Sequence, residues 1–236
     1  MRDNYNTLGF SFKEFTLRRS KADQLQMIHG AKSCSSGALV GRNLVLTANH
    51  TVNENESAKV IIHDIVLEAI VVERIPEFDV MLLEFNDSSL VGDVPRLNYG
   101  FANPHLGQKC YSTGFPLAEM VGFNPVFYSF EVSRLKVDQK PHFFQINREV
   151  SKGSSGMPVV NDRLEVLGVV TSKAASVLCG QTLPTDWGFA TNSQYFKDSI
   201  QKYLPPINIR PKPQLSSEDI AKKLNQTAVV VLACSL

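Results

Sequence analysis

The chain has 236 residues, enough for one large all-β domain or for two small lobes that share a site. Hydrophobic residues make up 43% of it, which predicts a packed core and excludes wholesale disorder. The formal net charge is +1, from 24 basic and 23 acidic residues. This balance argues against a nucleic-acid-binding surface and against a polybasic membrane patch.

The N-terminal residues are polar and contain no apolar segment of the kind that a signal peptide needs. No apolar run approaches the ~18 residues of a membrane-spanning helix. The four cysteines lie far apart, at positions 34, 110, 179 and 234, and this favours reduced thiols over a disulfide or zinc framework. We therefore expect a cytoplasmic protein that does not associate with membranes.

Short β-type runs broken by turn residues fill the sequence from 36 to 191. Residues 60–73 predict two strands joined by a tight turn at His63 and Asp64. Further strands are predicted at 38–40, 44–47, 79–85, 108–113, 126–133, 142–147, 157–160 and 165–172. Runs that recur about every ten residues favour a β-barrel or β-sandwich over alternating strands and helices.

A segment rich in Asn, Asp, Gly and Pro between 84 and 108 divides these strands into two groups. It is typical of a connector between two barrels, a first over about 20–90 and a second over about 105–191. Apolar residues at helical spacing then predict a helix over 192–204, with Asn192 or Ser193 as its N-cap. The prolines of the segment 205–214 predict a stiff, extended linker.

Residues 215–236 predict an accessory tail made of a helix and a strand. The helix begins after Ser216, where Asp219 completes a capping-box pattern. The strand covers the apolar run 228–234, which must find a partner or lie exposed as an apolar edge. The sequence leaves open whether this strand docks as an edge strand in cis, docks on a neighbouring chain, or belongs to a piece of a longer polypeptide.

A serine loop lies at 152–158 (Lys-Gly-Ser-Ser-Gly-Met-Pro) and places Ser155 in a tight turn. Acyl transfer by a serine hydroxyl needs a base within reach, a group that orients the base, and donors for the oxyanion. Gly153 permits a backbone geometry in which its N–H and that of Ser155 point at one spot. Alone, this segment is a weak signal, because Gly/Ser-rich turns are common on protein surfaces.

Two further segments supply the missing groups. His50 ends an apolar strand and its following turn, and Asp79 stands immediately before four apolar strand residues. A carboxylate beside that much apolar surface needs a partner, and an imidazole N–H is a suitable one. The other aspartates between His50 and Ser155 lie in polar turns instead.

Together these segments resemble the chymotrypsin/trypsin-like serine protease family. Residues 47–50 (Thr-Ala-Asn-His) match its histidine motif, 79–83 its aspartate strand and 153–158 its serine loop, in the family's order. The compact intervals between them are more similar to the bacterial HtrA/Deg branch than to the digestive enzymes. Three further segments resemble parts of the second barrel of that branch. Residues 106–116 resemble its first strand and turn, 166–171 the strand that binds the substrate backbone, and 187–192 the strand that closes the primary specificity pocket.

The resemblance implies an all-β fold of two six-stranded antiparallel β-barrels with a C-terminal helix, and the activity of a serine endopeptidase. It implies Ser155 as nucleophile, His50 as general base and Asp79 as the group that orients His50. Backbone N–H groups of Gly153 and Ser155 form the oxyanion hole. No metal or organic cofactor is required, and the expected partner is a protein or peptide substrate.

By the same resemblance, the primary specificity pocket is lined by Glu149, Thr171, Gly188 and Ala190. An acid at position 149 predicts a mild preference for Arg or Lys at the cleaved position, through a charge-assisted pair. The alternative is a solvated Glu149 beside the neighbouring basic residues.

The sequence departs from the family's pattern in several places. Ser154 stands where Asp or Asn is usual, which argues against zymogen activation by a freed N-terminus, and Met157 replaces a small residue. We expect no peptide-binding (PDZ) module after the protease segment, whereas 215–236 resembles the helix and first strand that open many bacterial trypsin-like domains.

Three alternatives to a constitutively active endopeptidase stay open. One is a catalytically silent protease fold kept as a binding or scaffolding module. A second is hydrolysis of small esters alone by the same three residues. A third is a protease that stays silent until a regulatory protein partner or a cleavage event orders the loops at 114–125 and 173–187.

Overall fold

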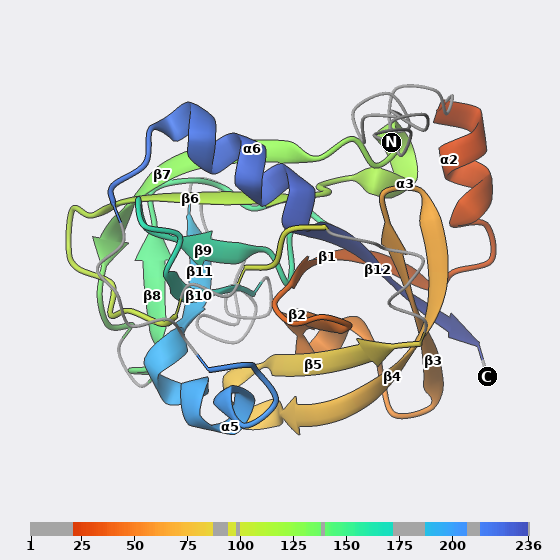
Figure 1. Cartoon of the computed structure of the whole chain (residues 1–236), viewed down its shortest axis with the longest axis horizontal. Helices are drawn as coiled ribbons and strands as arrows, with labels where there is room; N and C mark the ends of the chain where they lie inside the picture. The colour runs from red at the N-terminus through yellow and green to blue at the C-terminus, as the bar shows by residue number, and fades with distance from the viewer. Residues whose placement is uncertain are drawn as a thin grey trace, which may run out of the picture.

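The computed structural model describes residues 21–86, 94–97, 100–137, 140–171, 187–206 and 213–235. Its strands form two closed antiparallel β-barrels that lie side by side (Figure 1). The fold class predicted from the sequence is therefore confirmed.

The first barrel contains β1 (Ser33–Leu39), β2 (Leu44–Ala48), β3 (Glu56–Ile62), β4 (Ile65–Ile75), β5 (Val80–Phe85) and β12 (Ala228–Ser235). Around the barrel they follow the order β1-β12-β3-β4-β5-β2. The hairpin turn between β3 and β4 has φ angles of +47° at His63 and +68° at Asp64. Two positive φ angles give a turn whose twist matches that of the strands, and this confirms the turn predicted here.

The C-terminal strand β12 fills the space between β1 and β3 and pairs antiparallel with both. Its residues 229, 231 and 233 pack into the barrel core, whereas Val230 and Leu232 pack on the other face with Phe115 and Phe123. Because both faces are covered, the run is apolar throughout rather than at alternate positions. The strand docks in cis and is paired on both sides, so it is an integral barrel strand rather than an edge.

Helix α6 (Ser217–Thr227) leads into β12 and lies across β6 and β7 of the second barrel (Figure 1). The Asp219 N–H donates to Ser216 Oγ at 3.1 Å, which confirms the predicted N-cap. The buried side chains of Ile220 and Leu224 join the apolar cluster that lies between the barrels. The tail thus contributes both a barrel strand and part of the interface between the barrels.

The second barrel contains β6 (Lys109–Gly114), β7 (Val126–Arg134), β8 (Phe143–Ile146), β9 (Pro158–Val160), β10 (Val166–Val170) and β11 (Gly188–Asn192), in the order β10-β11-β8-β7-β6-β9. Helix α3 (Ala118–Val121) follows β6, and α2 (Lys21–Met27) precedes the first barrel. The serine loop therefore lies between β8 and β9.

The helix predicted over 192–204 is broken in two. A 3₁₀ turn, η4 (Ser193–Tyr195), is followed by the short helix α5 (Lys197–Gln201). The break lies at Phe196, whose φ of −120° is not helical and whose side chain is fully buried between the barrels. Packing of this side chain therefore overrides the helical pattern. Asn192 caps η4, since its side chain accepts from the Gln194 N–H at 3.0 Å.

Deleting residues 214–236 is expected to abolish cooperative folding, because it opens the first barrel between β1 and β3 and uncovers the apolar interface beneath α6. Thermal denaturation followed by circular dichroism measures this loss. A synthetic peptide of the same residues should restore the transition. A truncated chain that melts cooperatively within a few degrees of the full chain would contradict the integral role of β12.

Candidate active site

His50 lies in the 3₁₀ turn η1 (Asn49–Thr51), directly after β2. Two hydrogen bonds fix this turn: Thr51 Oγ1 donates to Ala48 O at 2.7 Å, and the Asn49 N–H donates to Asp79 O at 3.1 Å. The turn therefore lies against the segment that carries Asp79. The His50 side chain is 18% exposed, so one edge of the imidazole stays accessible.

Asp79 follows the 3₁₀ turn η2 (Pro76–Phe78), before β5, and has a left-handed φ of +54°. Asp is one of the residue types that tolerate this region. Its Oδ1 accepts from the His50 N–H at 3.0 Å, and its Oδ2 lies 2.7 Å from His50 Nδ1. The Thr171 hydroxyl, at the end of β10, also donates to Oδ2. The carboxylate is thus held by groups from both barrels.

Ser155 lies on the other side of the His50 imidazole from Asp79, with its Oγ 3.0 Å from His50 Nε2. Ser155, His50 and Asp79 come from three segments far apart in the sequence, and the structure brings them into one hydrogen-bonded chain. Both separations are within the range in which an imidazole takes a proton from a hydroxyl while a carboxylate orients its other nitrogen. The three residues singled out from the sequence therefore meet in space.

Burial of Asp79 by itself would raise the pKa of the carboxyl group. The side-chain hydrogen bond and the charge of His50 oppose burial, assisted by the Thr171 hydroxyl and the His50 N–H, and hold the pKa below its ordinary value. The carboxyl group is therefore ionised at neutral pH.

The serine loop depends on two glycines with positive φ, +91° at Gly153 and +89° at Gly156. A Cβ at Gly153 would lie 2.7 Å from Phe115 O, and one at Gly156 would lie 2.0 Å from Ser36 O. Both positions therefore exclude any side chain on steric grounds as well as by conformation. The loop is closely packed against β1 and against the segment after β6.

The peptide groups of this loop are tied down through their carbonyl oxygens. Lys152 O accepts from the Leu117 N–H at 2.8 Å, and Ser154 O accepts from the Met157 N–H at 3.1 Å. Because a peptide's N–H lies on the opposite edge from its C=O, these bonds direct the N–H groups of Gly153 and Ser155 away from those partners. Within the described part of the chain, the Gly153 N–H has no acceptor.

The pocket residues predicted from the sequence do not all share one environment. Gly188 and Ala190 are buried in β11. A Cβ at Gly188 would lie 2.7 Å from Arg148 O and 2.9 Å from both Ile146 Cγ1 and Val150 Cγ1. The space beside Gly188 is therefore filled by a backbone carbonyl and two aliphatic side chains, and sequence reasoning missed Ile146 and Val150 because neither has a distinctive pattern.

Glu149 and Thr171 differ from the other two predicted pocket residues. The Glu149 side chain is exposed, and the Thr171 hydroxyl binds Asp79 rather than facing an open pocket. Thr171 therefore donates a hydrogen bond to Asp79, a contact that its place in a predicted strand did not indicate.

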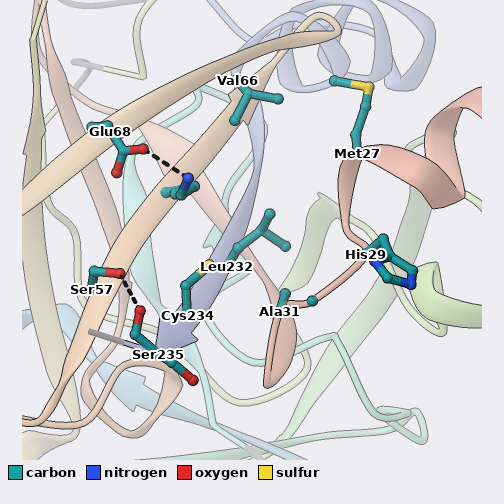
Figure 2. A pocket seen from close by; sticks show the side chains of 11 residues that line it. Met27, His29, Ala31, Ser57, Val66, Glu68, Leu232, Cys234 and Ser235 are labelled. Carbon is teal, nitrogen blue, oxygen red and sulfur yellow. Dashed lines mark hydrogen bonds and ion pairs between the residues drawn. The ribbon is translucent and has the colours of Figure 1, made fainter.

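A hollow of about 430 Å³ lies elsewhere, on the outside of the first barrel (Figure 2). It is lined by α2 and its following turn, by β3 and β4 and by the end of β12, and Lys59 and Glu68 form an ion pair at 2.8 Å on its wall. None of the residues of the Ser155–His50–Asp79 chain contributes to it.

No group of three His, Cys, Asp or Glu side chains in the described ranges is placed to hold a metal ion. Cys34, Cys110 and Cys234 are free thiols, and Cys179 lies outside the described residues. None of the helices that the structure describes is long and apolar enough to cross a membrane.

A family model, the trypsin-like peptidase domain, matches residues 35–169, a segment that contains His50, Asp79 and Ser155. The chain belongs to the trypsin-like peptidase family. This confirms the resemblance drawn from the three motifs, and the family supports the assignment as a serine endopeptidase. A search of curated protein sequences found no match.

Solved structures with the same fold include bacterial proteases. The active form of the Rv3671c protease from M. tuberculosis is 19% identical, covers 78% of this chain and 86% of its own, and has a TM-score of 0.55. The serine endoprotease from Yersinia pestis is also 19% identical, with 78% and 66% covered and a TM-score of 0.55. The MamO protease domain from Magnetospirillum magneticum is 23% identical, with 76% and 92% covered and a TM-score of 0.54. At these identities the likeness shows the fold, in keeping with the HtrA-like resemblance.

Replacing Asp79 by Asn should change how stability depends on pH. A carboxyl group whose pKa is lowered on folding stabilises the protein above its unfolded pKa of about 3.9, and this contribution is lost as the pH falls through the folded pKa. The free energy of unfolding of the wild type should therefore exceed that of Asp79→Asn at pH 6, and the difference should shrink below about pH 4. Urea denaturation at a series of pH values measures it, and a difference independent of pH would contradict the lowered pKa.

Proposed function

We propose that this peptidase cleaves peptide bonds through a Ser-His-Asp triad of Ser155, His50 and Asp79 and through an acyl-enzyme intermediate. The observation that carries the proposal is the continuous chain from Ser155 Oγ to His50 Nε2 at 3.0 Å and from His50 Nδ1 to Asp79 Oδ2 at 2.7 Å. A buried carboxylate, an imidazole and a hydroxyl in this order form the arrangement that activates serine in acyl transfer.

In the first half of the reaction, Ser155 Oγ attacks the scissile carbonyl carbon while His50 Nε2 takes the hydroxyl proton. Asp79 holds the Nδ1–H tautomer and stabilises the imidazolium that forms. The tetrahedral intermediate collapses as His50 donates the proton to the leaving amine, and the C–N bond breaks to leave the acyl-enzyme. In the second half, a water molecule attacks the ester with His50 again as base, which releases the carboxylic acid and restores Ser155.

The oxyanion of each tetrahedral intermediate is proposed to lie between the N–H groups of Gly153 and Ser155. Removal of one such donor in well-studied proteases lowers kcat by about 10²–10³-fold. The support here is the carbonyl anchoring of the serine loop, together with the Gly153 N–H that has no acceptor in the described residues.

The catalytically silent scaffold is the alternative that this site favours least. Burial of an ionised carboxylate costs free energy, and so does holding a serine hydroxyl in line with an imidazole. A binding surface requires neither. Hydrolysis of small esters alone would use the same three residues, so the choice of substrate in the test below distinguishes it.

Regulation by a partner protein is proposed for the loop 114–125. Its Leu117 N–H holds the carbonyl oxygen of Lys152, and Met120 and Val121 are 67% and 54% exposed on α3. A protein bound there would act directly on the serine loop. The second loop named from the sequence, 173–187, lies outside the described residues except for Trp187. A cytoplasmic location stays a prediction, as does the bacterial origin that the likeness to the HtrA/Deg branch implies.

Replacing Ser155 by Ala tests the nucleophile. The wild type should be labelled by a fluorophosphonate probe and should cut a denatured protein, and mass spectrometry of the products identifies the cut sites. Ser155→Ala should lose the label and at least about 10⁴-fold of the rate, since the residual catalysis of triad variants is small. Labelling that survives in Ser155→Ala would place the nucleophile elsewhere, and cleavage of esters without any protein cleavage would favour the esterase.

Glu149→Ala tests the proposed mild preference for Arg or Lys at the cleaved position. Because the Glu149 side chain is exposed, its loss should lower kcat/KM for these residues by only about threefold, as for a solvated ion pair, and should leave apolar residues unaffected. A peptide library with varied cleaved residues measures the profile. The matched control is Glu218→Ala, which removes an exposed glutamate from α6. An unchanged Glu149→Ala profile would contradict the proposed preference for Arg or Lys through Glu149.

A further inference from the structure

We propose that Ser36 is a positioning residue that holds the serine loop in the geometry needed to bind the oxyanion; this inference rests on the proposed function. Ser36 belongs to β1 of the first barrel, whereas the serine loop belongs to the second barrel. It is fully buried and touches no member of the Ser155–His50–Asp79 chain through its side chain.

Four hydrogen bonds converge on this one residue. Its N–H donates to Ser155 O at 2.9 Å, and its Oγ donates to Gly153 O at 2.7 Å. The same Oγ accepts from the Phe115 N–H at 2.8 Å, and its carbonyl accepts from Thr47 Oγ1 at 2.7 Å. The hydroxyl therefore uses its single proton on the serine loop and a lone pair on the segment after β6.

These bonds fix two peptide groups of the serine loop. Ser36 Oγ holds the peptide that follows Gly153, and the Ser36 N–H holds the peptide that follows Ser155. Gly153 has a φ of +91° and no side chain, so rotation about its backbone is the freedom that would misdirect its own N–H. With Lys152 O bound to Leu117 on one side and Gly153 O bound to Ser36 on the other, that rotation is blocked.

The molecule makes room for this hydroxyl. A Cβ at Gly114 would lie 2.6 Å from Ser36 Oγ, so a side chain there would displace it. The segment 114–117 thus contacts the serine loop twice: through Ser36 Oγ, which bridges the Phe115 N–H to Gly153 O, and through the Leu117 N–H, which binds Lys152 O directly. Ser36 therefore binds both the serine loop and the segment 114–117. A residue that only filled the barrel core would bind neither.

The adjacent Ser35 offers a matched control. It is also buried in β1, and its Oγ donates to Val231 O in β12 at 3.3 Å, within the first barrel. Ser35→Ala removes a buried hydroxyl from the same strand without touching the serine loop. A purely structural effect of losing a serine hydroxyl should therefore appear in both variants.

Ser36→Ala should lower kcat by about 30- to 300-fold, up to the size of losing one oxyanion donor, while KM changes by less than about threefold. A peptide aldehyde, whose hemiacetal with Ser155 places an oxyanion in the hole, should bind more weakly by a similar factor. The corresponding peptide alcohol, which forms no oxyanion, should bind as before. Ser35→Ala should match the wild type in all three measurements.

Hydrogen exchange of residues 151–157 gives a readout that does not depend on catalysis. Exchange should accelerate there in Ser36→Ala and not in Ser35→Ala. If the wild type neither turns over nor labels at Ser155, the proposed function fails, and the exchange data alone decide whether Ser36 positions the loop. Equal kcat in the two variants together with unchanged exchange would overturn the inference.

Ser36→Cys covers the case in which Ser36→Ala does not fold. The thiol keeps the shape of the side chain but is a much weaker donor, so kcat should again fall with KM nearly constant. A Cys variant that is fully active would show that filling the space suffices and would overturn the positioning role. Loss of folding in both variants would do the same, because Ser36 would then serve the fold alone.

Discussion

The buried Asp79 carboxylate is the constraint on which the arrangement of this molecule depends. An ionised carboxylate away from water is destabilising by several kcal/mol unless donors surround it. Its donors are the N–H and imidazole of His50 in the first barrel and the Thr171 hydroxyl in the second. The carboxylate therefore gains its third donor only when the barrels are docked, and the same docking brings Ser155 Oγ to 3.0 Å from His50 Nε2.

Apolar packing holds the barrels in that position. Side chains from β2 and β5 of one barrel and from β9 and β10 of the other meet in a single buried cluster. Phe196, between η4 and α5, and Ile220 and Leu224 of α6 join this cluster. Near Asp79, Thr191 Oγ1 of β11 donates to Phe78 O at 2.8 Å and ties the turn before the carboxylate to the second barrel. The polar contacts set the register of an interface whose stability comes from burial.

The sequence predicted the parts of the site that follow from local patterns. The strand ends that carry His50 and Asp79, the glycine-flanked Ser155 and the β3–β4 turn were all recognisable, because each depends on its own neighbours. The place of β12 was not, since pairing with β1 and β3 joins residues that are far apart in the chain. Ser36 was missed for the same reason: its bond to Gly153 spans 117 positions. Such contacts are set by how the barrels close and dock, and no local pattern reports them.

The large residue Met157 in the serine loop is explained by the residues that surround the loop rather than by the sequence of the loop itself. Met157 is 1% exposed and lies in the core of the second barrel, where a Cβ at Gly114 would come within 2.3 Å of its Cγ. The bulk of Met157 is thus accommodated by the absence of a side chain at Gly114, the same absence that admits the Ser36 hydroxyl. A single glycine at the end of β6 therefore allows both the large side chain of Met157, two residues after Ser155, and the hydrogen bond from Ser36 Oγ to Gly153 O. Because the two demands meet at one position, a side chain at Gly114 would displace both the Met157 side chain and the Ser36 hydroxyl.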